Sequence, residues 1–287
     1  MPALIDLRRR IKSVKNTQQI TQAMKTVSTA KFKKSQRAVL EARPHWHNSP
    51  DLLSDVVSWA EREVHPLCIE REEKKIEGLV ITSDKGLCGA FNSNLLEKAL
   101  SFFEEKAQRS QVNLVLIGKK ALSFFRKQPF PVDRVYSEQV QDLTLEDLKE
   151  LAQFLMRHYV FNRTDAVYVA YNEYKSILSP RVTVTRLLPL STPEGEAHEV
   201  LPPDWEPEAD SILNSLLHFY IESQIRHFYF ESQVSEHAAR MMAMDNATRN
   251  AEDLISDLTM VLNKIRQASI TEELLEIMTA VEALTGK

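Results

Sequence analysis

The chain has 287 residues, of which 43% are hydrophobic and 26% charged, a composition typical of folded proteins and not of disordered ones. Its formal net charge is −4, and its two cysteines are too few for a disulfide framework, which favours a reducing cytoplasmic compartment. The first thirty residues have no apolar core of a secretory signal, and no stretch approaches 18 consecutive apolar residues. The sequence therefore predicts neither secretion nor a membrane span.

Two long segments without Gly or Pro lie at the two ends of the chain, at residues 3–43 and 209–285. A helix over the second segment would extend roughly 110 Å, far beyond a typical helix of a globular domain. Such a helix needs a partner along its length. The first segment carries 11 Lys and Arg against two acids, and the second carries five against 12. This complementary charge favours pairing of the two segments as an antiparallel coiled coil.

The N-terminal segment has coiled-coil spacing at Leu4, Leu7, Ile11 and Val14. Gln18 interrupts this pattern, and the next apolar residues resume it in a shifted phase, at Ile20, Met24 and Val27. The shift predicts a local change in winding. Pro44 and Pro50 predict a break or bend in the helix, followed by a second helical run. We expect this N-terminal helical domain to span residues 1–65.

Residues 76–190 alternate short apolar runs with amphipathic segments, and this alternation predicts an α/β domain. The expected strands are 78–82, 112–117, 132–136, 166–171 and 181–188. The expected helices are 93–109, 119–127 and 145–161, with Thr144 as the N-cap of the last one. A mainly parallel sheet with helical cover follows, and its last two strands form an antiparallel pair at one edge. A Pro-rich stretch at 191–208 predicts a loop.

The C-terminal segment, 209–287, has a second coiled-coil pattern in which Ala251, Ile255, Leu258, Leu262 and Ile265 step by four and three. Ala268 to Ile270 shift the phase. The last turns are apolar on more than one face, more than a single helix partner covers. We therefore expect this tip to enter an apolar socket of a partner through Leu274, Leu275, Ile277, Met278 and Val281.

The motifs for chemistry are incomplete. Residues 83–92, Ser-Asp-Lys-Gly-Leu-Cys-Gly-Ala-Phe-Asn, stand between a strand and a helix, where phosphate-binding loops occur, but they match no established phosphate-binding pattern. A tight turn with Cys88 packed inside is favoured over a nucleotide site or a nucleophile. The eight histidines form no ligand set, and His45 and His47 alone make no metal site. We predict no catalytic residue, no cofactor and no metal.

Two alternative functions remain at this point: an enzyme whose middle domain binds a nucleotide, and a coiled-coil adaptor or nucleic-acid binder that uses the basic N-terminal segment. The basic segment has only Phe32 as an aromatic residue before Trp46, so it offers no stacking platform for nucleic acid. Its apolar seam demands a packed helix instead. A paired helix is therefore the favoured role of this segment.

Three motifs resemble the gamma subunit of F-type rotary ATP synthases. They are residues 11–28 (IKSVKNTQQITQAMKTVS), residues 83–92 (SDKGLCGAFN), and residues 235–252 (SEHAARMMAMDNATRNAE) continued by residues 263–277 (NKIRQASITEELLEI). The resemblance covers the whole chain in order. Plastid members of that family carry a long regulatory insertion with a cysteine pair, and we find no such insertion in this sequence.

The resemblance implies the fold class already expected, an α/β protein with an antiparallel coiled coil of two long terminal helices plus a central, mainly parallel α/β domain. It also implies a non-catalytic central rotating shaft, which couples transmembrane proton flow to ATP synthesis or hydrolysis at beta-subunit sites. The implied partners are the alpha and beta subunits of the catalytic hexamer, the epsilon subunit and the c-ring, at the cytoplasmic face of the bacterial inner membrane. Motif alignment implies beta-subunit contacts by Met24, Arg266, Gln267, Thr271 and Glu273.

Overall fold

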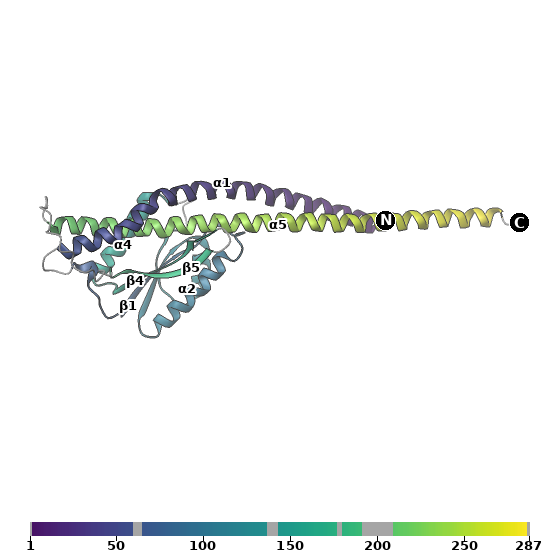
Figure 1. Ribbon diagram of the computed structural model, residues 1–287. Coiled ribbons are helices and arrows are strands. Elements are labelled where there is room, and N and C mark those ends of the chain that lie inside the picture. The colour runs from purple at the N-terminus through teal and green to yellow at the C-terminus, as the bar shows by residue number, and fades with distance from the viewer. Residues whose placement is uncertain (1, 60–64, 137–142, 177–179, 191–208, 286–287) are drawn as a thin grey trace. The chain divides into compact units, whose positions relative to one another are not determined.

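The computed structural model describes residues 2–59, 65–136, 143–176, 180–190 and 209–285. It divides into two compact units: the first combines Met1–Ser28 with Met241–Lys287, and the second is Thr29–Arg240. The two longest helices, α1 (Pro2–Trp59) and α5 (Ala209–Thr285), each contribute to both units (Figure 1). These units do not follow the expected helical domains of 1–65 and 209–287, because part of each helix packs in the unit that holds the sheet. The loop expected at 191–208 lies outside the described residues.

In the first unit, α1 and α5 form an antiparallel coiled coil, as predicted. Three pairs across the helices define its register: Gln18 Nε2 donates to Glu252 Oε1 at 3.0 Å, the hydroxyls of Thr21 and Thr248 share a hydrogen bond of 2.8 Å, and Lys25 Nζ lies 2.5 Å from Asp245 Oδ1. As the residue number rises on α1, it falls on α5, which is the signature of antiparallel helices.

The seam of α1 follows one heptad pattern without a phase shift. Its buried or half-buried positions in this unit include Leu4, Leu7, Ile11, Val14, Gln18, Thr21, Lys25 and Ser28. Ile20 and Val27 instead point outward, with 60% and 59% of their surfaces exposed. The predicted shift in phase is therefore wrong. It assumed that seam positions are apolar, whereas Gln18, Thr21 and Lys25 keep the register through polar contacts across the helices.

The seam of α5 has the same regular spacing, and the predicted positions are confirmed. Its buried or half-buried residues include Met244, Thr248, Ala251, Ile255, Leu258, Leu262, Ile265 and Ser269. Every side chain from Ile270 to Val281 is exposed. Within this unit, α5 continues beyond the start of α1 as a single helix (Figure 1).

The helix α1 runs without interruption to Trp59, so of the break or bend expected near Pro44–Pro50, the break does not occur. A proline inside a helix removes one backbone donor and crowds the carbonyl four residues earlier, which bends a helix without necessarily ending it. The hydrogen bonds of the neighbouring turns remain. Residues 60–64 lie outside the described part, and a short 3₁₀ helix, η1 (Pro66–Cys68), leads to the sheet.

The second unit holds a five-stranded sheet in the order β3-β2-β1-β4-β5. The strands are β1 (Lys75–Ile81), β2 (Gln111–Ile117), β3 (Val132–Tyr136), β4 (Ala166–Tyr174) and β5 (Pro180–Leu188). The first four are parallel, and β5 pairs antiparallel with β4 at the edge, as predicted. All five strands were expected, with ends that differ by no more than three residues.

Helices cover both faces of this sheet. On one face, α2 (Phe91–Ala107) and α3 (Lys119–Phe125) enclose a core that includes Phe103 and Leu114. On the other, α4 (Leu145–Val160) and residues 213–229 of α5 enclose the larger core. The predicted cap of α4 is confirmed, because Thr144 Oγ1 accepts from the Asp147 backbone and the Asp147 carboxylate accepts from the Thr144 backbone.

Candidate partner surface and buried polar sites

The residues predicted to contact a partner lie at two separate levels of the coil. Arg266, Gln267, Thr271 and Glu273 are all exposed and lie within about two turns of α5, and Thr271 Oγ1 donates to the Gln267 carbonyl at 2.9 Å. Met24 is half-buried and lies next to Lys25, which pairs with Asp245. The step along α5 from Asp245 to Arg266 corresponds to roughly 30 Å at 1.5 Å per residue. The two groups of predicted contacts are therefore separate along the coil.

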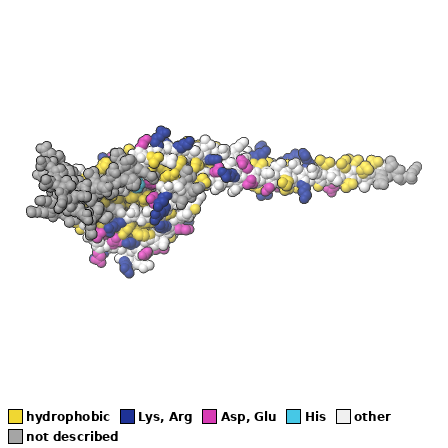
Figure 2. All heavy atoms as spheres, viewed as in Figure 1, with side chains coloured by type: hydrophobic (Ala, Val, Ile, Leu, Met, Phe, Trp, Pro, Cys, Tyr) yellow, Lys and Arg dark blue, Asp and Glu magenta, His cyan; other side chains and the backbone are white. Residues whose placement is uncertain are grey.

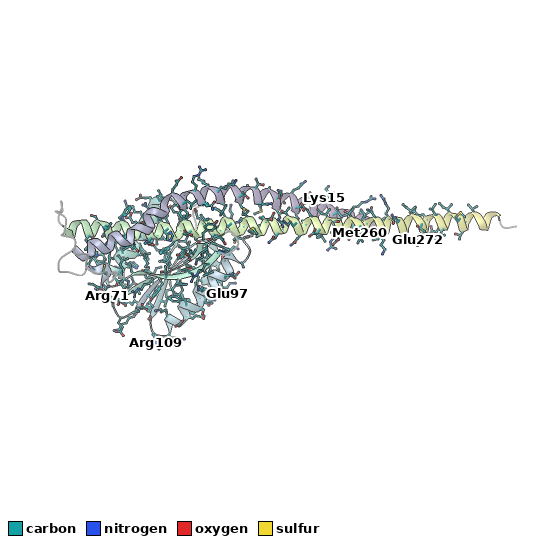
Figure 3. All side chains as sticks on the ribbon, viewed as in Figure 1. Lys15, Arg71, Glu97, Arg109, Met260 and Glu272 are labelled. Carbon is teal, nitrogen blue, oxygen red and sulfur yellow. The ribbon has the colours of Figure 1, made fainter. Side chains whose placement is uncertain are left out.

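The end of α5 presents apolar side chains to solvent. The five predicted tip residues range from 51% exposed at Val281 to 68% at Met278, with Leu274, Leu275 and Ile277 between these values. Figure 2 shows hydrophobic side chains along this end of the helix. Met260 and Glu272 project from α5 in the same unit, and Lys15 projects from α1 (Figure 3). An apolar surface of this extent is typical of a site that a partner covers.

The 83–92 loop is a tight turn filled by its own side chains. Cys88 is buried, and Asn92 Nδ2 lies 3.1 Å from its Sγ and 2.8 Å from Ser83 Oγ. Burial raises the pKa of the Cys88 thiol, which disfavours the nucleophilic thiolate. Leu87 and Gly89 both adopt positive φ, at 62° and 59°. The favoured interpretation of this motif, a packed turn, agrees with this geometry.

A buried arginine of α5 holds the 83–92 loop. Arg240 Nη2 donates to the carbonyls of Lys85 at 3.0 Å and of Gly86 at 3.3 Å, and Nη1 pairs with Glu236 at 2.6 Å. The planar guanidinium thus connects two backbone acceptors and a carboxylate at once. Sequence reasoning missed this contact, because Arg240 lies more than 150 positions from the loop.

The usual ligand crevice of an α/β sheet is occupied by the chain itself. In such sheets ligands bind beyond the carboxyl ends of the strands, where the strand order reverses, which is between β1 and β4 here. At this place Ser232 Oγ donates to the Ile81 carbonyl at 3.4 Å, and Ser235 Oγ donates to the Asn172 carbonyl at 3.2 Å. Both serines belong to α5. This packing disfavours a nucleotide site in the crevice.

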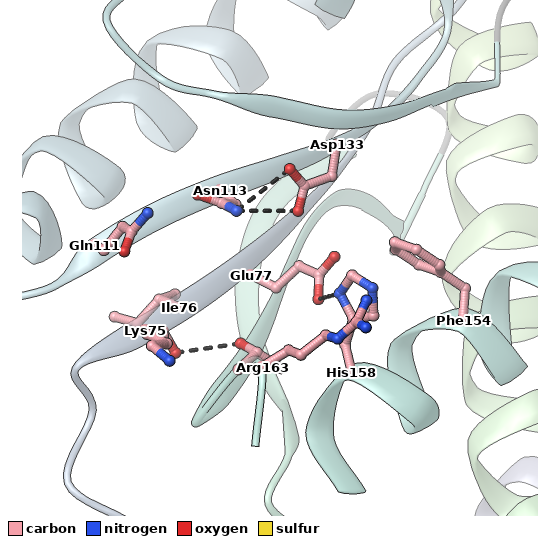
Figure 4. A pocket seen from close by; sticks show the side chains of 10 residues that line it. Lys75, Ile76, Glu77, Gln111, Asn113, Asp133, Phe154, His158 and Arg163 are labelled. Carbon is pink, nitrogen blue, oxygen red and sulfur yellow. Dashed lines mark hydrogen bonds and ion pairs between the residues drawn. The ribbon is translucent and has the colours of Figure 1, made fainter. Parts of the chain in front are cut away.

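A second polar cluster lies at the opposite, amino ends of the strands, in a pocket of about 530 Å³ (Figure 4). Glu77 of β1 is 1% exposed, and its Oε2 lies 3.1 Å from Nδ1 of His158 in the last turn of α4. Asp133 of β3 is exposed, and Asn113 Nδ2 donates to both of its carboxylate oxygens, at 3.0 and 3.3 Å. Glu77 and Asn113 are direct partners in the β1–β2 register.

Burial governs the protonation of this cluster. Burial, reinforced by the charge of Asp133, raises the pKa of Glu77 to about 8. Burial also lowers the pKa of His158. Both shifts favour a hydrogen bond between neutral groups over an ion pair at neutral pH. The other carboxylate oxygen of Glu77, Oε1, is buried and has no hydrogen-bond partner among the described residues. No local sequence pattern predicts this cluster, because its members come from three distant elements.

The fold and these sites define an α/β protein that carries an antiparallel coiled coil made from both ends of its chain. The family model described as ATP synthase matches residues 3–284. The chain belongs to this family, and its curated relatives are ATP synthase gamma chains. That of Pelotomaculum thermopropionicum is 43% identical over 286 residues, with 99% of this chain and 100% of the relative covered. That of Desulforudis audaxviator is 40% identical over 297 residues, with the same coverage of 99% and 100%.

Solved structures support the same fold. The central stalk and c-ring structure of the Tetrahymena thermophila mitochondrial ATP synthase contains a chain with a TM-score of 0.58 and 25% identity, covering 79% of this chain and 99% of that one. A chain of the Euglena gracilis mitochondrial ATP synthase has a TM-score of 0.66 and 20% identity, covering 98% and 95%. Within the described residues, no helix has the length and apolarity to cross a bilayer.

Proposed function

We propose that this chain is the central rotating shaft of an F-type ATP synthase, and that it couples transmembrane proton flow to ATP synthesis or hydrolysis at beta-subunit sites. The observation that carries the proposal is the coil of the first unit, in which both helix ends wind together and α5 then continues alone. The ATP synthase gamma chains to which the protein is similar, and the central stalk structure, support this assignment.

The coil surface supports enclosure by other subunits. Its seam is partly polar, while large apolar side chains such as Ile20, Val27 and Met260 face outward. A solitary coil would bury these side chains and expose the polar ones. Alpha and beta subunits arranged as a hexamer would cover the outward residues. The exposed tip from Leu274 to Val281 would occupy the apolar socket of that hexamer.

The shaft itself is proposed to be non-catalytic. The crevice at the β1–β4 switch point accepts side chains of α5, and Cys88 is a buried thiol with a raised pKa. Catalysis would then belong to the beta subunits. Turning the shaft would change the contact energy that each beta site experiences, and each site's equilibrium would shift by that difference. The epsilon subunit, the c-ring and a location at the cytoplasmic face of the bacterial inner membrane complete the proposal.

The proposed beta-subunit contacts fall into two groups. Arg266, Gln267, Thr271 and Glu273 would form one contact near the start of α1, where four polar side chains are exposed. Met24 would form a second contact, at the level of Asp245 on α5. Different beta-subunit segments would therefore touch the shaft at the two levels.

Deletion of Leu274–Lys287 tests the proposal, with deletion of Gly286–Lys287 alone as the matched control. Five exposed apolar side chains are lost, each contributing about 1 kcal/mol if a socket buries its exposed half. We expect the longer deletion to weaken assembly with alpha and beta subunits on native gels and the control to assemble normally. Circular dichroism should show both variants folded. Full assembly and coupled turnover of the longer deletion would remove the tip from the interface.

The competing functions make different predictions for the isolated chain. A nucleotide-binding enzyme would bind or hydrolyse ATP alone, and a nucleic-acid binder would bind DNA or RNA tightly with a steep salt dependence. We expect none of these activities from the purified chain. Copurification with alpha and beta subunits would favour the shaft.

A further inference from the structure

The pocket at the amino ends of the strands holds three side chains with metal-binding atoms. One donor atom each from Glu77, Asp133 and His158 lies within 4.8 Å of the others. The three residues come from β1, β3 and α4, so the fold alone brings them together. Figure 4 shows the Glu77 carboxylate directed toward the His158 ring, with Asp133 on the same side of the sheet.

The buried carboxylate supplies an independent indication of a ligand. Glu77 is 1% exposed, and its Oε1 has no hydrogen-bond partner among the described residues. A buried carboxylate oxygen without a donor is costly, so such atoms are usually paired with a donor, a water or an ion. No described donor reaches it. A cation bound by both oxygens of the Glu77 carboxylate, together with Asp133 and His158, would satisfy this atom.

We propose that Glu77, Asp133 and His158 bind one divalent transition-metal ion of the Zn²⁺ type. Imidazole nitrogen and carboxylate oxygen are ligands that Zn²⁺ accepts at 2.0–2.2 Å, which sets tetrahedral donors about 3.4 Å apart. The contact of 3.1 Å between Glu77 Oε2 and His158 Nδ1 is already near that value. The donors, which lie within 4.8 Å of one another, close by up to about 1.4 Å to reach this geometry. Water from the open side of the pocket completes the coordination.

The surroundings contain one supporting and one opposing feature. Asn113 orients the Asp133 carboxylate with two hydrogen bonds, as outer-shell residues do around metal ligands. Arg163 and Lys75 also line the pocket, and their positive charges oppose a cation. Arg134 is engaged by Glu150 at 2.7 Å, which reduces its effect on the site. The ion would connect the end of α4 to β1 and β3, and would stiffen this side of the sheet.

Calorimetric titration of the chelator-treated, full-length chain with ZnCl₂ tests the site, and CoCl₂ serves as a spectroscopic probe. We expect one saturable Zn²⁺ site and a visible Co²⁺ absorption band of a low-coordinate N/O site. Glu77→Gln and His158→Gln should abolish both signals, and Asn113→Ala should weaken Zn²⁺ at least tenfold. Arg163→Gln should tighten binding roughly threefold, the scale of a screened surface charge.

His218→Gln is the matched control, because His218 lies on α5 and does not line the pocket that contains Glu77. Its Nδ1 lies 2.7 Å from the Asn214 carbonyl. This variant should bind Zn²⁺ as the wild type does. Circular dichroism checks that each variant is folded, and Glu77→Gln keeps the side-chain volume. Two results would overturn the proposal: no saturable site in the wild type, or wild-type affinity in Glu77→Gln and His158→Gln, which would place the ion elsewhere.

Discussion

Replacement of Arg240 by alanine should be among the most destabilising single changes in the second unit. The side chain is 10% exposed, donates to the carbonyls of Lys85 and Gly86, and pairs with Glu236 at 2.6 Å. Breaking a buried pair on one side costs about 3–5 kcal/mol, because the Glu236 carboxylate and the two carbonyls lose this donor. With a urea m-value of about 2–3 kcal/mol/M, the unfolding midpoint should fall by about 1–2 M.

Two further variants test whether the buried contacts of Arg240 cause this loss of stability. Arg240→Lys keeps the charge but not the planar fork, so about half of the effect should remain. Arg249→Ala is the control, because Arg249 is 72% exposed and pairs with Asp245 at 2.9 Å, a surface contact worth about 0–1 kcal/mol. Hydrogen exchange by mass spectrometry should show faster exchange in residues 83–92 of Arg240→Ala only. A midpoint equal to that of Arg249→Ala would show that the buried contacts of Arg240 do not stabilise the second unit.

Three further changes test the coil, the sheet and the partner surface. Hydrogen bonding to Lys25 lowers the pKa of Asp245 below its ordinary 3.8, so this stabilisation is present above that pH and is lost as the pH falls through the lowered pKa. Asp245→Asn should be less stable than the wild type at pH 7, and the two thermal midpoints should converge below pH 4; a constant gap would contradict this. Gly78→Ala should cost about 1–3 kcal/mol in urea unfolding, since its Cβ would lie 2.4 Å from the Phe103 ring. Gly86→Ala, whose nearest contact is 3.7 Å, should be near neutral, and equal losses would exclude the steric cause. Arg266→Ala with Gln267→Ala should leave the isolated chain folded by circular dichroism yet lower assembly or coupled turnover, and wild-type values for both would exclude these residues from the interface.

Local sequence signals predict most of the elements because each element satisfies local rules. Runs of Val, Ile and Leu between turn residues specify the strands, and Thr144 with Asp147 specifies the start of α4. The long stretches without Gly or Pro specify the two long helices. Pro44 and Pro50 misled the prediction, since the local rule describes what a proline removes and not whether the neighbouring turns still hold the helix.

The sites were less predictable than the elements, because they depend on contacts between distant residues. Arg240 and the 83–92 loop carry no shared local pattern, and only the packing of α5 on the sheet unites them. Glu77, Asp133 and His158 likewise lie at least 25 positions apart along the chain. The topology sets their neighbours: register pairs Glu77 with Asn113, and the strand order places β3 beside β2. No spacing rule for metal ligands covers such an arrangement.

The polar seam explains why the prediction for α1 wrongly placed Ile20 and Val27 in the seam after Gln18. The apolar residues Ile20 and Val27 follow helical spacing, but the described coil buries Thr21 and Ser28 instead. A helix that turns its apolar side chains outward is stable in isolation only to the extent that its polar contacts hold it. Each exposed side chain then retains burial energy of about 1–2 kcal/mol for another surface. In a shaft, this division of roles lets the seam hold the two helices together. The outward face is then available for the contacts that change as the shaft turns.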